Sequence, residues 1–222
     1  MRRIFLFTCI FFPLHAQDSV QQLVESLYPK NNRLKEIRMG DVVRQLAVHD
    51  GSRVADVGCG AGEFSVILSH VVRASGRVYC EDIVDEKDWG LSRAKANLKK
   101  QHVKNVVIIR GAADDPKLPR DSLDAVLIVN AYHEMPQYQP MLRHIRESLK
   151  PGGRLVILDN MPHRTGQRPR EKQADNHVLS PDLAAGELQA AGFHILDRED
   201  TFIDGPDSES SHWLIAAERP AP

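Results

Sequence analysis

The sequence has few cysteines, few aromatic residues and almost no net charge. Three cysteines in 222 residues do not make a disulfide framework. The 29 basic and 30 acidic residues nearly cancel, to a formal net charge of -1. No overall field therefore attracts nucleic acid or an anionic membrane. The 42% hydrophobic and 27% charged residues exclude a disordered or collagenous chain and suffice for one sizeable core.

The chain also lacks a long hydrophobic run, but a short one stands at its start. Arg2 and Arg3 precede the apolar stretch 4–12, and Ala16 offers a small residue for cleavage. Residues 1–16 are therefore predicted to be a secretory signal peptide, too short to span a bilayer as a mature helix. We expect an exported protein, periplasmic or secreted, without a stable membrane span. If the signal is not used, the protein stays cytoplasmic.

The hydrophobic periodicity divides the remainder into two parts. Residues 17–50 are predicted to form N-terminal helices, at 20–27 and 34–48. Residues 51–222 alternate between strand and helix patterns. The expected strands are 53–57, 77–80, 106–109, 123–129, 155–158, 193–196 and 213–217, and the expected helices include 64–71, 85–101, 139–149 and 181–191. Apolar strands separated by helices predict an α/β domain with a doubly wound, mostly parallel seven-stranded sheet.

Three glycines lie between the first of these strands and the following helix. Gly58, Gly60 and Gly62 alternate in the segment VADVGCGAGEF. Glycine permits positive φ and a close approach of the backbone to a ligand. The helix N-terminus adds free N–H groups, and ligands of parallel sheets lie beyond the carboxyl ends of the strands. The segment is therefore predicted to bind a cofactor or substrate.

Two common nucleotide motifs do not fit this segment. A dinucleotide fingerprint needs a third glycine where this chain has Glu63 or Ser65, according to the register. A phosphate-binding P-loop needs Gly-Lys-Ser/Thr, which does not follow. A glutamate at the helix start also repels a pyrophosphate. A nicotinamide oxidoreductase is therefore disfavoured.

The spacing Asp56-x-Gly58-x-Gly60-x-Gly62 resembles the first motif of class I S-adenosylmethionine-dependent methyltransferases. The resemblance runs from about residue 34 to the C-terminus and includes Pro151-Gly152-Gly153 before the fifth strand. It implies S-adenosyl-L-methionine as the cofactor. It also implies that the glycine loop holds the amino-acid part of this molecule, through Asp56, Gly58, Cys59, Gly60 and Gly62.

The resemblance assigns the rest of the cofactor site as well. Asp82 ends the second strand, where the family binds the ribose hydroxyls, and Glu81 is the alternative if the register differs by one. A carboxylate can accept two hydrogen bonds from a diol. Ala113 and Asp114 match the adenine contacts. Asn130 begins the loop that lies beside the methyl group in the family.

The candidate catalytic residues follow Asn130 directly. Tyr132, His133 and Glu134 either act on the methyl acceptor or only shape the loop. His133 is the candidate base, because the unperturbed pKa of histidine is near 6.5. His177 either faces the pocket or is a solvated loop residue. The histidines show no His-x-x-x-His spacing and the cysteines no Cys-x-x-Cys spacing, so the sequence predicts no metal.

We therefore expect a methyltransferase that acts on a small molecule, with a protein acceptor as the less favoured case. The segment after the fourth strand lacks the Asn-Pro-Pro-Tyr/Phe motif of many nucleic-acid amino-methylating enzymes. The alternative is an exported, non-catalytic ligand-binding domain that kept the fold, since this cofactor is scarce outside the cytoplasm. No motif identifies the acceptor or the oligomeric state. The arginines of 164–172 either meet an acidic substrate or a membrane surface, or form a solvated face.

Overall fold

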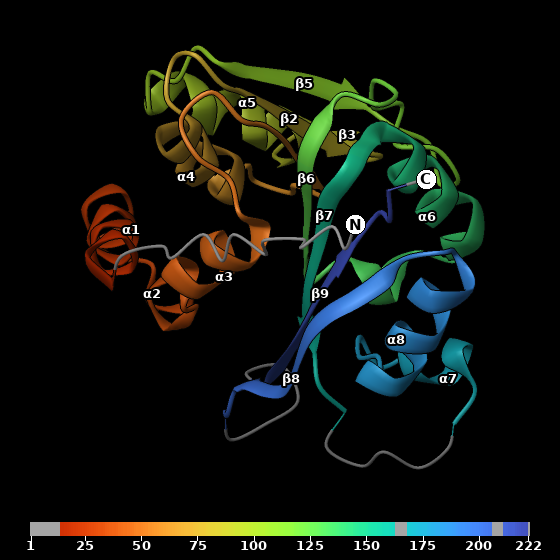
Figure 1. Ribbon diagram of the computed structural model, residues 1–222. Helices are drawn as coiled ribbons and strands as arrows, with labels where there is room; N and C mark the ends of the chain where they lie inside the picture. Colours follow the sequence, from red (N-terminus) through yellow and green to blue (C-terminus); the bar gives the residue numbers. More distant parts are fainter. Residues whose placement is uncertain (1–13, 163–167, 206–210, 222) are drawn as a thin grey trace, which may run out of the picture.

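The computed structural model describes residues 14–162, 168–205 and 211–221 (Figure 1). A seven-stranded sheet forms its centre, in the order β5-β2-β1-β6-β7-β9-β8. All neighbours from β5 to β7 are parallel, whereas β9 is antiparallel to both β7 and β8. The strands are β1 (Arg53–Val57), β2 (Arg77–Asp82), β5 (Val106–Arg110), β6 (Leu123–Val129), β7 (Leu149–Asn160), β8 (His194–Ile203) and β9 (His212–Glu218). This topology confirms the expected doubly wound, mostly parallel sheet.

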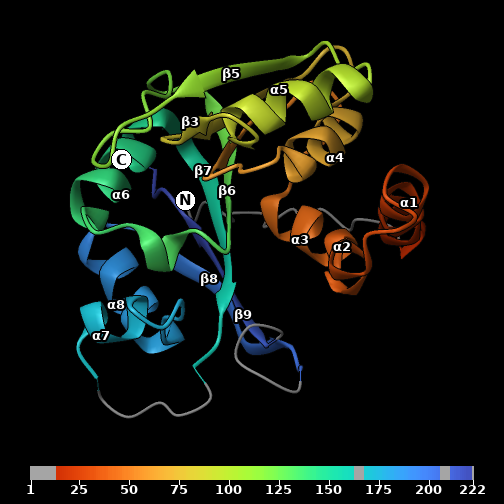
Figure 2. The same ribbon diagram turned by 180° about the vertical axis from the view of Figure 1, so that it is seen from behind.

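Helices cover both faces of the sheet (Figures 1 and 2). One layer holds α1 (Leu14–Leu27), α2 (Asn32–Glu36), α3 (Met39–Leu46), α4 (Glu63–Val72) and α5 (Leu91–Lys100). The other holds α6 (Tyr138–Ser148), α7 (Arg170–Ala174) and α8 (Pro181–Ala190). The Ser180 side chain accepts a hydrogen bond from the Leu183 N–H, so it caps α8 as the sequence predicts.

The core divides into two parts because successive strand residues point to opposite faces. Val54 and Val78 pack under the N-terminal helices and α4, whereas Ala55 and Tyr79 pack under α6 and α8. Both sets are buried. The strands can therefore be apolar along their whole length, which explains the near-continuous hydrophobic runs in the sequence.

Two expected helices are interrupted. The helix predicted at 85–101 is wrong in its first part, where β3 (Asp85–Glu86) and β4 (Trp89–Gly90) form a small hairpin. Asp88 and Gly90 have φ values of +65° and +55°, which a right-handed helix does not accommodate. The helix predicted at 34–48 is divided between α2 and α3, because Ile37 has an extended backbone.

The signal-peptide prediction concerns residues that lie almost entirely outside the described part of the chain, which begins at Leu14 within α1. None of the helices described is both long and apolar enough to cross a membrane. The export prediction therefore stays a prediction.

Within the sheet, β2 lies next to β1 on one side and β6 lies next to β1 on the other, so the strand order changes direction at β1. Such a change of direction is where doubly wound sheets bind ligands, beyond the carboxyl ends of the strands. The glycine loop after β1, the end of β2 and the loop after β6 all meet at this point. The loop after β6 includes the short 3-10 helix η1 (Tyr132–Glu134).

Candidate functional site

A cavity of about 690 Å³ lies at this edge of the sheet. Its walls come from the glycine loop, the end of β2, the loop after β6, and the N-terminal α2 with its flanking residues. The volume falls within the range of about 300–1,000 Å³ that is usual for small-molecule sites. Leu34 and Ile37 contribute apolar side chains to one wall, so the N-terminal helices complete the cavity.

The glycine loop depends on backbone conformations that favour glycine. Gly58, Gly60 and Gly62 have φ values of +72°, +50° and +71°. A Cβ on Gly58 would also stand 2.6 Å from the Cβ of Ala131. The loop after β1 and the loop after β6 therefore touch where a side chain would separate them. Gly58, Cys59 and Gly60 line the cavity, whereas Gly62 lies at the start of α4.

Asp82 connects the glycine loop to β2. One carboxylate oxygen accepts the Gly60 N–H at 2.9 Å and the other accepts the Val84 N–H at 2.8 Å. A carboxylate has about four lone-pair positions, so two are left for the hydroxyls of a ribose. Asp82 lines the cavity and is half-buried, as this role requires.

Glu81 has different surroundings. Its carboxyl group is buried, and its Oε1 has no hydrogen-bond partner within the described part of the chain. Burial and the charge of Asp82 raise the pKa of Glu81 to about 8. The group is therefore largely protonated at neutral pH, and Asp82 is the residue whose geometry suits a charge-assisted bond to a diol.

Asp56 lies below the loop rather than in the cavity. It is buried, and its Oδ2 accepts a hydrogen bond from the Ser65 hydroxyl at 2.7 Å. Burial raises the pKa of Asp56 to about 7. In the structure as described, Asp56 does not line the cavity. The structure therefore places Asp56 where its hydrogen bond joins β1 to α4, and its expected cofactor contact stays a prediction.

Of the residues expected beside the adenine and the methyl group, some line the cavity and some do not. Ala113 lines the cavity, but Asp114 is exposed and, within the described ranges, is outside the cavity lining. Asn130 lines the cavity with a φ of +50°. Its amide nitrogen and oxygen are buried, and neither has a partner among the described residues. An orphaned amide in a cavity wall is suited to bind a polar ligand.

His133 is held from two sides by one carboxylate. Its Nδ1 lies 2.6 Å from Asp159 Oδ1, and its backbone N–H donates to Asp159 Oδ2 at 2.8 Å. Burial lowers the pKa of His133, but the hydrogen bond and charge of Asp159, with the charge of Glu134, outweigh it and raise the pKa. Because Nδ1 is occupied, Nε2 is the nitrogen left for chemistry.

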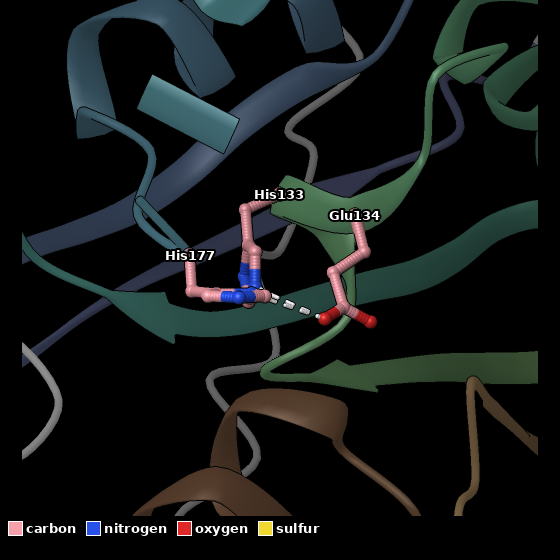
Figure 3. Close-up of side chains that lie close together, drawn as sticks. All are labelled: His133, Glu134 and His177. Carbon is pink, nitrogen blue, oxygen red and sulfur yellow. Dashed lines mark ion pairs between the residues drawn. The ribbon is translucent and has the colours of Figure 1, made fainter. Parts of the chain in front are cut away.

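Glu134 and His177 face this nitrogen (Figure 3). Glu134 Oε1 lies 3.7 Å from His133 Nε2 and 3.3 Å from His177 Nδ1. The two imidazole rings meet edge to face, with centroids 5.8 Å apart. The His177 side chain is 70% exposed and, among the described residues, lies outside the cavity lining, as the solvated-loop alternative expects, but its Nδ1 lies beside Glu134. Sequence spacing could not show that His177 lies beside Glu134, since α6, β7 and α7 come between His133 and His177.

Tyr132 points away from these groups. Its side chain is fully buried, and its hydroxyl donates to Glu187 Oε2 at 2.5 Å. Arg170 pairs with the same carboxylate at 2.9 Å and lies over the tyrosine ring. Among the residues described, Tyr132 is not part of the cavity lining. Burial and the charge of Glu187 also raise the pKa of Tyr132. The described contacts of Tyr132 are those of a core residue, and its catalytic role stays a prediction.

Comparison with known proteins identifies the family. The family described as "Methyltransferase domain" matches residues 48–197, about two thirds of the chain. A demethylmenaquinone methyltransferase of Lactococcus lactis is 29% identical over 151 residues, which cover 64% of this chain and 59% of the relative. The chain thus spans about three fifths of the length of that relative.

Solved structures share the fold. A SAM-dependent methyltransferase from Aquifex aeolicus superposes with a TM-score of 0.70 at 23% identity, covering 89% of this chain and 97% of its own. The [4+2]-cyclase SpnF also reaches 0.70, at 16% identity, with coverages of 94% and 96%. The family match over two thirds of the sequence, the glycine loop and the seven-stranded sheet together show that this chain belongs to the class I S-adenosylmethionine-dependent methyltransferase family.

Proposed function

We propose that this protein transfers a methyl group from S-adenosyl-L-methionine to a small-molecule acceptor. One observation carries the proposal: Gly58 and Gly60 line the same cavity as Glu134. The segment that suits the cofactor and the segment that carries acid–base side chains therefore face one enclosed space. Its volume of about 690 Å³ suits two small molecules in contact better than a folded protein or a duplex.

The residues present fit this cofactor. Asp82 has lone pairs for the two ribose hydroxyls, and Gly58 allows the backbone to approach the amino-acid end. The unpartnered amide of Asn130 supplies a donor and an acceptor close to the loop after β6. We therefore assign Asp82, Gly58, Cys59, Gly60, Ala113 and Asn130 to the cofactor end of the cavity.

His133 and Glu134 mark the acceptor end. When bound, the cofactor supplies a methyl group on a cationic sulfur, which keeps the carbon–sulfur electron pair as the acceptor's lone pair bonds to carbon. The chain's own task is to align the acceptor, exclude water and help the acceptor lose its proton. Leu34, Ile37 and Met141 provide apolar wall, and Glu134 provides a polar group in the wall. His133 lies directly behind Glu134, with Nε2 3.7 Å from its Oε1.

The relatives suggest which acceptor to test first. Several carry the name demethylmenaquinone methyltransferase. A reduced, hydroxylated quinone ring is apolar with one or two polar groups. These properties suit a cavity with Leu34 and Met141 in its wall and Glu134 at its acceptor end. We propose a hydroxylated aromatic ring of this kind as the acceptor class.

Cofactor binding should be measured first, by thermal unfolding of the full chain with S-adenosylhomocysteine. A ligand at 100 times its dissociation constant adds about 2.7 kcal/mol, which corresponds to a rise of roughly 5–11 °C. Transfer is then tested with isotope-labelled cofactor and a reduced demethylated quinone, with the product detected by mass spectrometry. The absence of any thermal shift at millimolar ligand contradicts the proposal, and binding without transfer to any ring acceptor favours the non-catalytic binding domain.

A further inference from the structure

We propose that His133, Glu134 and His177 bind a divalent transition-metal cation at the acceptor end of the cavity. Each offers one ligand atom, and these atoms all lie within 4.8 Å of one another (Figure 3). This proposal replaces the absence of metal expected from the sequence. The spacing along the chain is not that of a metal motif, but the fold brings a distant histidine beside a His-Glu pair.

The buried member of the cluster has the supporting contact that metal-binding histidines usually have. The His133 ring is 3% exposed, and its Nδ1 is hydrogen-bonded to Asp159, which is completely buried. A carboxylate on one ring nitrogen fixes the tautomer and directs the other nitrogen to a metal. The same carboxylate holds the His133 backbone, so the ring has little freedom to turn away.

The backbone of the exposed histidine, His177, is also held in place by hydrogen bonds. The Asn160 amide donates to the His177 carbonyl at 2.9 Å, and the His177 N–H donates to the Ala174 carbonyl at 2.8 Å. His177 has a φ of +54°, an uncommon conformation for a residue with a side chain. Strain of this kind persists only where the surroundings impose it, and it is frequent at functional sites.

The distances between the three ligand atoms are close to those around a bound metal, so small side-chain movements would suffice. Tetrahedral ligands about 2.0–2.2 Å from zinc stand about 3.3–3.6 Å from one another. Glu134 Oε1 is already 3.3 Å from His177 Nδ1 and 3.7 Å from His133 Nε2. The His133–Glu134 pair needs to close by about 0.1 Å, and no two ligand atoms are more than 4.8 Å apart. Glu134 and His177 are the exposed members and can make this adjustment by side-chain rotation.

The ligand set selects the kind of cation. Two imidazoles and one carboxylate suit Zn²⁺, Co²⁺, Ni²⁺ or Fe²⁺, whereas Mg²⁺ and Ca²⁺ prefer oxygen ligands alone. Three protein ligands also leave at least one coordination position open, which is typical of catalytic rather than structural metals. Glu134 lines the cavity, so the open position would face the acceptor. This last step rests on the proposed function, but metal binding itself does not.

The experiment uses the full chain, stripped with a chelator and titrated with Zn²⁺ and, separately, Co²⁺ by calorimetry. We expect one ion per chain, a Co²⁺ absorption spectrum typical of nitrogen and oxygen ligands, and no comparable binding of Mg²⁺. His177→Asn and Glu134→Gln should each weaken Zn²⁺ binding at least tenfold, because even an outer partner of a metal ligand is commonly worth about 10–100-fold. Asparagine tolerates the positive φ at position 177.

The chain offers a matched control. His194 Nδ1 lies 3.3 Å from Glu218 Oε1, the same separation as in the His177–Glu134 pair, and both histidines are exposed. His194 lies on β8, outside the cluster, so His194→Asn should leave the affinity unchanged. Substoichiometric binding, or an equal loss in His194→Asn and His177→Asn, would overturn the proposal.

Thermal shifts with S-adenosylhomocysteine on the metal-free protein keep the two proposals separate. If the protein binds the nucleoside but no metal, the metal site is disproved and the methyltransferase proposal stands. If it binds metal with the predicted variant pattern but no nucleoside, the metal site stands and the proposed function fails.

Discussion

The two ends of the cavity are constructed differently. At the cofactor end, the loop after β1 is joined to the adjacent β2 by the bond from Gly60 to Asp82. At the acceptor end, His133, Asp159 and His177 come from three segments far apart in the sequence. The first end is defined by backbone conformation and the second by side-chain partnerships. Changes at each end should therefore have separable effects.

The largest effect expected concerns the pH dependence of stability at the cofactor end. Glu81 has a pKa of about 8 in the fold against its ordinary value of 4.5, so the native state holds this proton more tightly than the unfolded chain does. Its contribution to stability is complete below pH 4.5 and is lost as the pH rises through 8. At 1.36 kcal/mol per pKa unit, the loss is of the order of 5 kcal/mol.

Glu81→Gln should remove this loss, so that its free energy of unfolding falls less between pH 5 and 8.5 than that of the wild type. Urea unfolding across this range measures the difference. Asp56, Asp82 and Asp115 contribute charge near Glu81 and are present in both proteins, so the variant changes one carboxyl group only. Parallel pH profiles for the two proteins would show that Glu81 ionises normally in the fold.

The next effect tests the close approach of the two loops. Gly58→Ala places a Cβ 2.6 Å from Ala131 at a φ of +72° and should lower the free energy of unfolding by about 2–4 kcal/mol. Gly60→Ala is the matched control, with a φ of +50° and open space around the added carbon, and should cost only about 1–2 kcal/mol. Equal losses in urea unfolding would mean that contact with Ala131 is unimportant.

A smaller effect is expected on the cofactor itself. Asp82→Ala should weaken S-adenosylhomocysteine binding by about 1–3 kcal/mol, because it removes hydrogen bonds to a charged group and frees the Gly60 N–H. Calorimetric titration measures this change. Asp114→Ala is the comparison, since that side chain is exposed, and it should change the affinity little. A larger loss for Asp114→Ala would reverse the two assignments.

The smallest effect sharpens the contrast between the ends. His177→Asn should change S-adenosylhomocysteine affinity by less than about 0.5 kcal/mol, as is usual for an exposed residue away from the ligand. The same variant should lose metal affinity. A parallel loss of both affinities, measured by calorimetry on one preparation, would show that the two ends form a single cooperative site.

This contrast also explains what could be predicted from the sequence. The sheet, the capped start of α8 and the glycine loop beside the cavity depend on local patterns such as apolar runs, Ser180-Pro181 and alternating glycines. Local chemistry of this kind is visible in the sequence before folding. The position of Asp82 at the end of β2 was predictable for the same reason, because the apolar strand before it is visible in the sequence. Its contact with a ribose stays a prediction.

The missed features depend on contacts between distant segments. The sequence did not show that Asp159 would occupy one nitrogen of His133, or that His177 would face the other. Tyr132 stands beside His133 in the sequence, yet Glu187 and Arg170 hold its hydroxyl in the core. The hairpin of β3 and β4 was missed because the positive φ values of Asp88 and Gly90 interrupt an otherwise helical sequence pattern.

The cluster of His133, Glu134 and His177 depends on the length of β7, because its two supports stand at the end of that strand. Asp159 and Asn160 are consecutive residues, and they hold His133 and His177 respectively. They pair with Trp213 and His212 of β9, which sets their register. Because neighbouring strand residues point to opposite faces, inserting or deleting one residue within β7 would turn both supports away. Such a length change would dismantle the cluster although all of its own residues stayed in the sequence.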